Sequence, residues 1–188
     1  MDRKEFLHKA MGMGICSCTL AFLNGETHAA SEKETTQEKI NRLEGEKQFI
    51  QNWLIDLLDT IDKELDRDTQ VKLLAGCGQG CFKRHSFKTD IAKKGQGNVD
   101  KLIEAYKQNF EIWQDGEQVH IRYGETSSHC YCPAANYRPA KPDDIHCECT
   151  RATHQAIWET AMGKPMNVTI LESLRRGGKT CHFIVDLT

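Results

Sequence analysis

The chain has 188 residues, nine cysteines and a formal net charge of −2, with 25 Lys and Arg against 27 Asp and Glu. This near-neutral balance provides no electrostatic footprint for nucleic acid, so we expect no nucleic-acid partner. The length behind an N-terminal leader suffices for one domain with its own core. We therefore expect a single cysteine-rich domain over residues 30–188.

Residues 1–29 have the three zones of an export signal peptide. A short charged stretch precedes a mildly apolar run, 10–23, and small residues up to Ala29 fit a cleavage site. The run is shorter than the roughly 20 residues that span a bilayer. No later apolar run approaches that length, so we expect no integral membrane segment after processing. The sequence predicts an exported, periplasmic bacterial protein.

The start of the leader also suggests a route of export. Residues 3–9 resemble the twin-arginine translocation signal, although Lys4 stands where that signal has its second arginine. The resemblance implies export of an already folded protein, often one loaded with a metal or cofactor in the cytosol. An ordinary secretory signal is the alternative.

The first element of the expected domain is a long helix. Apolar residues over 40–65 recur at spacings of three and four, as on one face of an amphipathic helix. A coiled-coil dimer would have the same spacing, but Gly45 interrupts the pattern and favours packing on the chain's own domain. We then expect three side chains of the stripe to be buried: Leu54, Leu57 and Ile61.

The middle of the chain mixes short helices with loops. We expect a short helix at 70–75, a loop at 86–97, and a helix from Asn98, as its cap, to about residue 109. Ile112 and Trp113 lead into a turn at Asp115-Gly116, and a strand with alternating apolar residues follows at 119–123. Residues 124–150 are irregular, with three prolines and four cysteines.

The C-terminal part completes the fold class. The pattern predicts a helix over 153–162, strands over 167–174 and 180–187, and a turn at 175–178 between the strands. We therefore expect an α+β fold, with helices packed on one face of a small antiparallel sheet and a cysteine-rich loop beside them.

The closing segment resembles a known family. Glu172-Ser173, a glycine-containing turn and Cys181-His182-Phe183-Ile184-Val185 are similar to the last hairpin of the 4-vinyl-reductase-like and 2-aminothiazoline-4-carboxylate-hydrolase-like domains. Cys130-Tyr131-Cys132-Pro133 and Cys147-x-Cys149, followed by a helix and Gly163-Lys164-Pro165, resemble bacterial relatives of that group. The resemblance covers roughly the last 60 residues. It implies an α+β domain with a small-molecule pocket between helices and sheet.

Six cysteines outside the leader form three close pairs. Because the chain is exported, three disulfides are one interpretation, and bonds between pairs are favoured because a ring inside Cys-x-Cys is strained. Zinc or an iron–sulfur cluster is the second interpretation, with His85 completing one set, although Cys-x-Cys is a poor match to zinc spacing. Redox-active thiols are the third. The candidate metal ligands are Cys77, Cys81, Cys130, Cys132, Cys147 and Cys149.

Two histidines adjoin these cysteines. His129 and His146 can act as acid/base groups because imidazole titrates near neutrality. Our first hypothesis is an exported small-molecule-binding or sensor domain with a structural or metal-binding cysteine cluster. The alternative is a metal-dependent hydrolase of a small cyclic or amide-like substrate, in which His129 or His146 transfers a proton.

Overall fold

The computed structural model describes residues 34–132 and 138–188, and the chain divides into two compact units, Met1–Lys39 and Ile40–Thr188. The expected leader, 1–29, lies outside the described residues. Helix α2 (Thr36–Glu64) begins within the first unit, with a capping box at its N-terminus. There the backbone N–H of Thr35 donates to Glu38 Oε2 at 2.8 Å, and the N–H of Glu38 donates to Thr35 Oγ1 at 3.2 Å.

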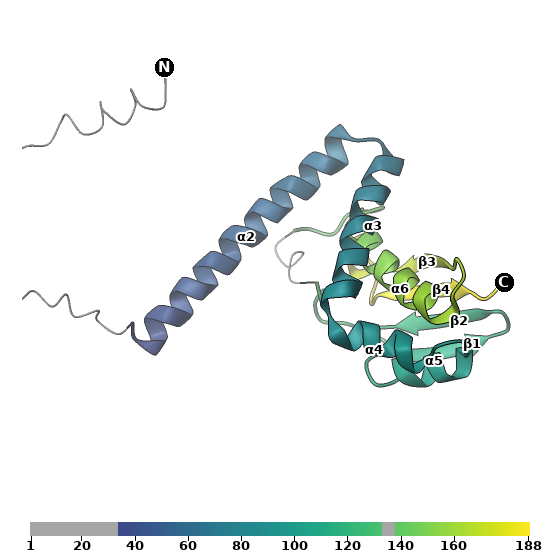
Figure 1. Cartoon of the computed structure of the whole chain (residues 1–188). Coiled ribbons are helices and arrows are strands. Elements are labelled where there is room, and N and C mark those ends of the chain that lie inside the picture. Colours follow the sequence, from purple (N-terminus) through teal and green to yellow (C-terminus); the bar gives the residue numbers. More distant parts are fainter. Residues whose placement is uncertain (1–33, 133–137) are drawn as a thin grey trace, which may run out of the picture. The chain divides into compact units, whose positions relative to one another are not determined.

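The second unit contains a four-stranded antiparallel sheet of order β1-β2-β4-β3 (Figure 1). The first two strands form a hairpin, and their turn has Gly116 in the left-handed region at φ 57°. The turn predicted at Asp115-Gly116 is thus confirmed, whereas the strand before it was not predicted. The strands are β1 (Glu111–Asp115), β2 (Gln118–Arg122), β3 (Asn167–Glu172) and β4 (His182–Asp186).

One face of the sheet forms the main core. Val119 pairs with Val185 and Ile121 with Phe183, and these four side chains are fully buried. Helices α4 (Ser86–Lys94), α5 (Val99–Tyr106) and α6 (Cys147–Met162) supply the other side of this core. The predicted α+β class, with helices packed against an antiparallel sheet, is confirmed.

The helices differ in extent from the sequence expectations. The second helix, α3 (Arg67–Arg84), is capped by Asp66 and runs through the glycine–cysteine segment instead of ending at residue 75. The expected loop at 86–97 is mostly helix α4, which ends at Gly95. Asn98 caps α5 as predicted, its side chain accepting from the N–H of Lys101. Tertiary packing overrides the low helix propensity of glycine in α3.

A close helix crossing explains one glycine of α3. A Cβ added at Gly78 would lie 2.2 Å from the carbonyl oxygen of Cys149 and 2.8 Å from the Cβ of Ala152. The same closeness lets Thr153 Oγ1 donate to the Gly78 carbonyl at 3.1 Å. Only glycine permits this approach of α3 to α6, and the crossing brings the cysteines of the two helices to one region.

Helix α2 has fewer buried apolar residues than predicted. Leu54 and Ile61 are half-buried, and Leu57 is 39% exposed, so the expected burial of Leu57 is wrong. Leu58 is buried instead, in a small cluster with Leu74 and Ile145. The face that packs on the domain is therefore rotated away from the center of the apolar stripe.

A buried ion network holds the loop before α6. Asp144 is fully buried and accepts from Arg138 Nη1 at 2.7 Å and from Arg175 Nη2 at 2.8 Å. Although burial opposes it, the His146 N–H and both guanidinium groups hold the pKa of Asp144 below its usual value. The predicted turn after β3 contains a 3₁₀ helix, η2 (Leu174–Arg176), whose Arg175 turns inward to Asp144.

Across residues 34–132 and 138–188, no helix combines the length and apolarity that crossing a bilayer requires.

Candidate functional site: an aromatic cavity bordered by thiols

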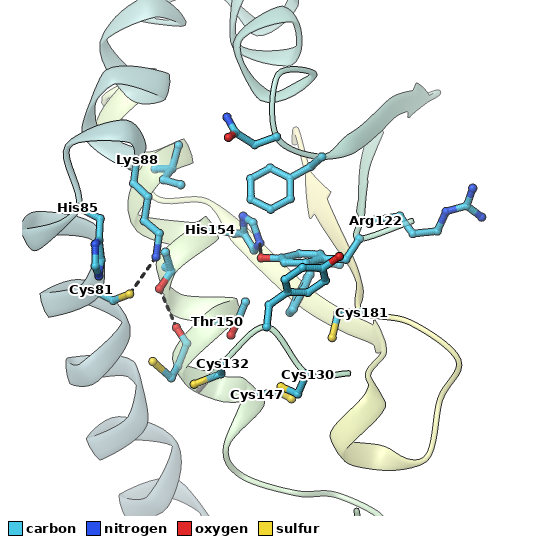
Figure 2. Close-up of a pocket in the computed structure, with 18 of the residues that line it drawn as sticks. Cys81, His85, Lys88, Arg122, Cys130, Cys132, Cys147, Thr150, His154 and Cys181 are labelled. Atoms are coloured by element: carbon cyan, nitrogen blue, oxygen red, sulfur yellow. Dashed lines mark hydrogen bonds between the residues drawn. The ribbon is translucent and has the colours of Figure 1, made fainter. Parts of the chain in front are cut away.

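A cavity of about 850 Å³ opens between the helices and the sheet (Figure 2). Its walls come from the ends of α3 and β2, from the segment between α5 and β1, from α4, α6 and β4, and from the segment that ends at Cys132. Such a volume suits a small organic molecule. The aromatic residues of the lining are Phe87, Phe110, Tyr123, Tyr131 and Phe183.

A chain of three polar side chains runs from the core to the cavity. The hydroxyl of Tyr106, which is fully buried, lies 3.2 Å from His154 Nδ1. His154 Nε2 lies 3.0 Å from the hydroxyl of Tyr123. His154 and Tyr123 line the cavity, so the chain ends at a residue that borders the cavity.

All three groups are uncharged near neutral pH. Burial lowers the pKa of His154 to about 3, and the charge of Lys88 adds to that effect. Burial also raises the pKa of Tyr106 and of Tyr123 well above the usual value for tyrosine. The chain is therefore a neutral hydrogen-bonding element and does not hold an ionic ligand by charge.

Cationic side chains lie along the same cavity. Lys88 Nζ donates to Cys81 Sγ at 2.8 Å (Figure 2). Arg122 Nε donates to Glu111 Oε2 at 2.7 Å, and its guanidinium group lies 5.2 Å from the Trp113 ring centroid. The cavity thus combines an apolar interior with a few polar groups near its edge, as ligand sites do.

Five of the six predicted cysteine ligands line this cavity: Cys81, Cys130, Cys132, Cys147 and Cys149. Cys77 is exposed on α3 one turn before Cys81, and Cys181, which was not predicted as a site residue, also lines the cavity. Figure 2 shows Cys130, Cys132 and Cys147 gathered on one side of the cavity. The cavity thus gathers cysteines from α3, from the segment after β2, from α6 and from the residue before β4.

The two thiols of the Cys147-x-Cys149 pair are protonated near neutral pH. Burial raises the pKa of Cys147 and of Cys149 to about 12, and neighbouring thiols add to the shift. For Cys147 these neighbours are Cys181 and Cys130; for Cys149 the first is Cys132.

The thiols as placed do not form a coordination set. Within the two described stretches, no group of three or more His, Cys, Asp or Glu side chains lies in position to hold a metal ion. No disulfide links the seven cysteines that the structure describes. Binding of zinc or an iron–sulfur cluster stays a prediction, as does each disulfide.

The two predicted acid/base histidines lie in different environments. His146 lines the cavity, is buried, and has Nε2 3.0 Å from Cys132 Sγ. Burial lowers its pKa to about 4, so it is unprotonated at neutral pH. His129 is exposed, lies outside the lining, and has Nδ1 3.0 Å from Ser128 Oγ. Only His146 is placed to meet a molecule in the cavity.

Sequence reasoning did not identify His154 or Tyr123. His154 lies three residues before Ile157 and four before Trp158, both buried, and so shares their inward helical face. A histidine on an apolar helix face is a signal that a sequence offers. Tyr123 continues the inward alternation of Val119 and Ile121, and its tyrosine hydroxyl gives that position its polar end.

Comparison with known proteins gives limited information. No protein-family model matches the chain. No curated protein matches it either. Among solved structures, it is similar to a vinyl-4-reductase family protein from Methanocaldococcus jannaschii, with 14% sequence identity and a TM-score of 0.29 over 74% of this chain and 92% of that chain. This likeness is too distant to carry an argument about function.

Proposed function

We propose that this chain is an exported domain that binds a small, planar and largely apolar molecule carrying a hydrogen-bond acceptor. The cavity bounded by α6 and the sheet is the observation that carries the proposal. Its size and aromatic lining suit a flat ligand, and the Tyr123 hydroxyl can donate to the acceptor. The export signal predicted at 1–29 would place this activity in the periplasm.

The cysteines support the cavity in this proposal. The cavity wall contains segments that carry no regular structure around Cys130 and Cys132. In an oxidising compartment, disulfides from this pair to Cys147 and Cys149 would fix that wall. The buried Asp144 network already anchors the other end of the same loop.

Binding can be tested with two matched tyrosine variants. Tyr123→Phe and Tyr106→Phe each remove one hydroxyl bonded to His154, but only Tyr123 lines the cavity. We expect a panel of small aromatic carbonyl compounds, measured by calorimetry, to include a ligand whose affinity falls roughly tenfold in Tyr123→Phe, the effect of one lost hydrogen bond.

The control variant shows which results would contradict the proposal. Tyr106→Phe should bind the same compound as tightly as the unmodified protein. Equal losses in both variants would show that the hydroxyls act through folding and not through contact with the ligand. A panel in which no compound binds would count against a ligand cavity at this place.

A hydrolase is the second candidate, and the position of His146 favours it. His146 is unprotonated and borders the cavity, so it can accept a proton from a reacting group there. Hydrolysis of a small cyclic amide-like substrate by the purified protein, lost in His146→Gln and retained in His129→Gln, would support this candidate. Equal activity in both variants would refute the role of His146.

A further inference from the structure

Helix α2 presents a second apolar stripe that its own domain does not cover. Leu43, Ile50 and Leu57 recur every seven residues and are 48%, 56% and 39% exposed. Trp53, three residues after Ile50, is 58% exposed. We name Leu43, Ile50, Trp53 and Leu57 the α2 stripe. Side chains of this size on one helical face are a site for a partner when nothing covers them.

The face that packs on the domain is a different one. Leu58 is buried against Leu74 and Ile145, and Asp59 accepts from Arg138 at 2.7 Å. At 100° per residue, Leu58 lies roughly 80° around the helix from Ile50. The domain therefore holds α2 by one face and leaves the α2 stripe beside it exposed.

The stripe has the pattern of a coiled coil. With Leu43, Ile50 and Leu57 at d positions, the a positions are Ile40, Lys47, Leu54 and Ile61. Gly45 then falls at an f position, on the side opposite the seam, and it is helical with open space around it. It does not interrupt the seam, so the sequence argument against a coiled coil is wrong.

The charges at the a and g positions favour pairing of α2 with a second copy of itself. Lys47 is the one polar side chain at the four a positions, and Glu46 is its neighbour at g. In a parallel, in-register pair of identical helices, Lys47 of one copy lies next to Glu46 of the other, so this layer holds two lysines and two glutamates and is neutral. A single polar a position of this kind specifies register and oligomeric state.

From the stripe, the heptads and this charge pairing, we infer that the partner of α2 is a second copy of the same chain, bound as a parallel two-stranded coiled coil. The apolar a and d positions run from Ile40 to Ile61, so the seam spans roughly three heptads, and its last a residue, Ile61, also packs against the buried cluster around Leu58. The dimer leaves the cavity residues, which lie beyond residue 80, outside the seam.

The test is the mass of the full protein in solution, with matched substitutions on α2. We expect light scattering after size exclusion to give twice the mass of one chain, which is 21.4 kDa when the leader is retained. Ile50→Glu should weaken the dimer at least about tenfold. Phe49→Glu, which changes a side chain that is 74% exposed but lies at a c position, should leave the dimer intact.

Charge variants test the parallel register. Lys47→Glu should weaken the dimer because the layer then carries four negative groups, and Glu46→Lys combined with Lys47→Glu should restore it. Circular dichroism of each variant checks that the domain is folded. A monomer at all concentrations, equal effects of Ile50→Glu and Phe49→Glu, or recruitment of the unmodified monomer to lipid vesicles through Ile50 would overturn the inference.

Discussion

His154 should make the protein sensitive to mild acid. Its pKa is about 3 in the folded chain, against 6.5 for an ordinary histidine, because the side chain is buried between two tyrosines. The folded pKa is depressed, so the stabilisation is complete above pH 6.5 and is lost as the pH falls toward 3. Between pH 7.5 and pH 5, His154 becomes protonated in the unfolded chain but stays neutral in the folded chain. The loss is about 2 kcal/mol for this residue.

The assay is urea denaturation at both pH values, followed by circular dichroism. His154→Gln removes the titrating group, so its drop in unfolding free energy from pH 7.5 to pH 5 should be smaller by about 2 kcal/mol. Any constant cost of the substitution cancels in this difference. His129→Gln, on the exposed loop, should show the full drop. Equal drops in all three proteins would refute the buried, neutral state of His154.

Three further outcomes follow from packing, charge and sulfur chemistry. Gly78→Ala should destabilise the fold by about 2 kcal/mol or more because the added Cβ meets the Cys149 carbonyl oxygen. Gly76→Ala, on the exposed side of α3, should stabilise the fold by about 0.5–1 kcal/mol. Thermal melts compare the two variants. Asp144→Asn should cost about 3–5 kcal/mol because it removes the buried carboxylate that Arg138 and Arg175 share. Asp143→Asn, at an exposed left-handed position that asparagine tolerates, should cost little. Under the proposed export, peptide mapping of the protein without reductant should link Cys130 and Cys132 to Cys147 and Cys149. Intact thiols in that protein, with unfolding by a chelator, would instead support a metal.

Strands β2, β3 and β4 were predictable because their signal is local, whereas β1 was not predicted. Val119 and Ile121, and Phe183 and Val185, alternate at the period that a strand with one buried face requires. The helix through Gly78 was not predictable, because local propensity disfavours glycine and only contact with α6 explains its place. Charged pairs between distant segments, such as Arg175 with Asp144, have no local signal either.

For the site, the sequence indicated the cysteine segments but not their geometry. Cys-x-Cys pairs are visible in a sequence, whereas the side of the fold that they reach depends on the α3–α6 crossing and on the loop anchored at Asp144. The chain from Tyr106 through His154 to Tyr123 joins three elements, so it exists only in the folded protein.

That chain also fixes where its protons lie. A neutral imidazole has one N–H and one bare nitrogen. If the Tyr123 hydroxyl donates a hydrogen bond to a ligand, its oxygen accepts from His154 Nε2–H. His154 Nδ1 then carries no proton and accepts from the Tyr106 hydroxyl. A ligand that only donates a hydrogen bond to the Tyr123 oxygen allows the opposite donor and acceptor roles in both hydrogen bonds of His154. The donor or acceptor character of the bound molecule therefore determines which ring nitrogen of His154 carries the proton. Nitrogen NMR shifts of His154 report this tautomer from inside the core.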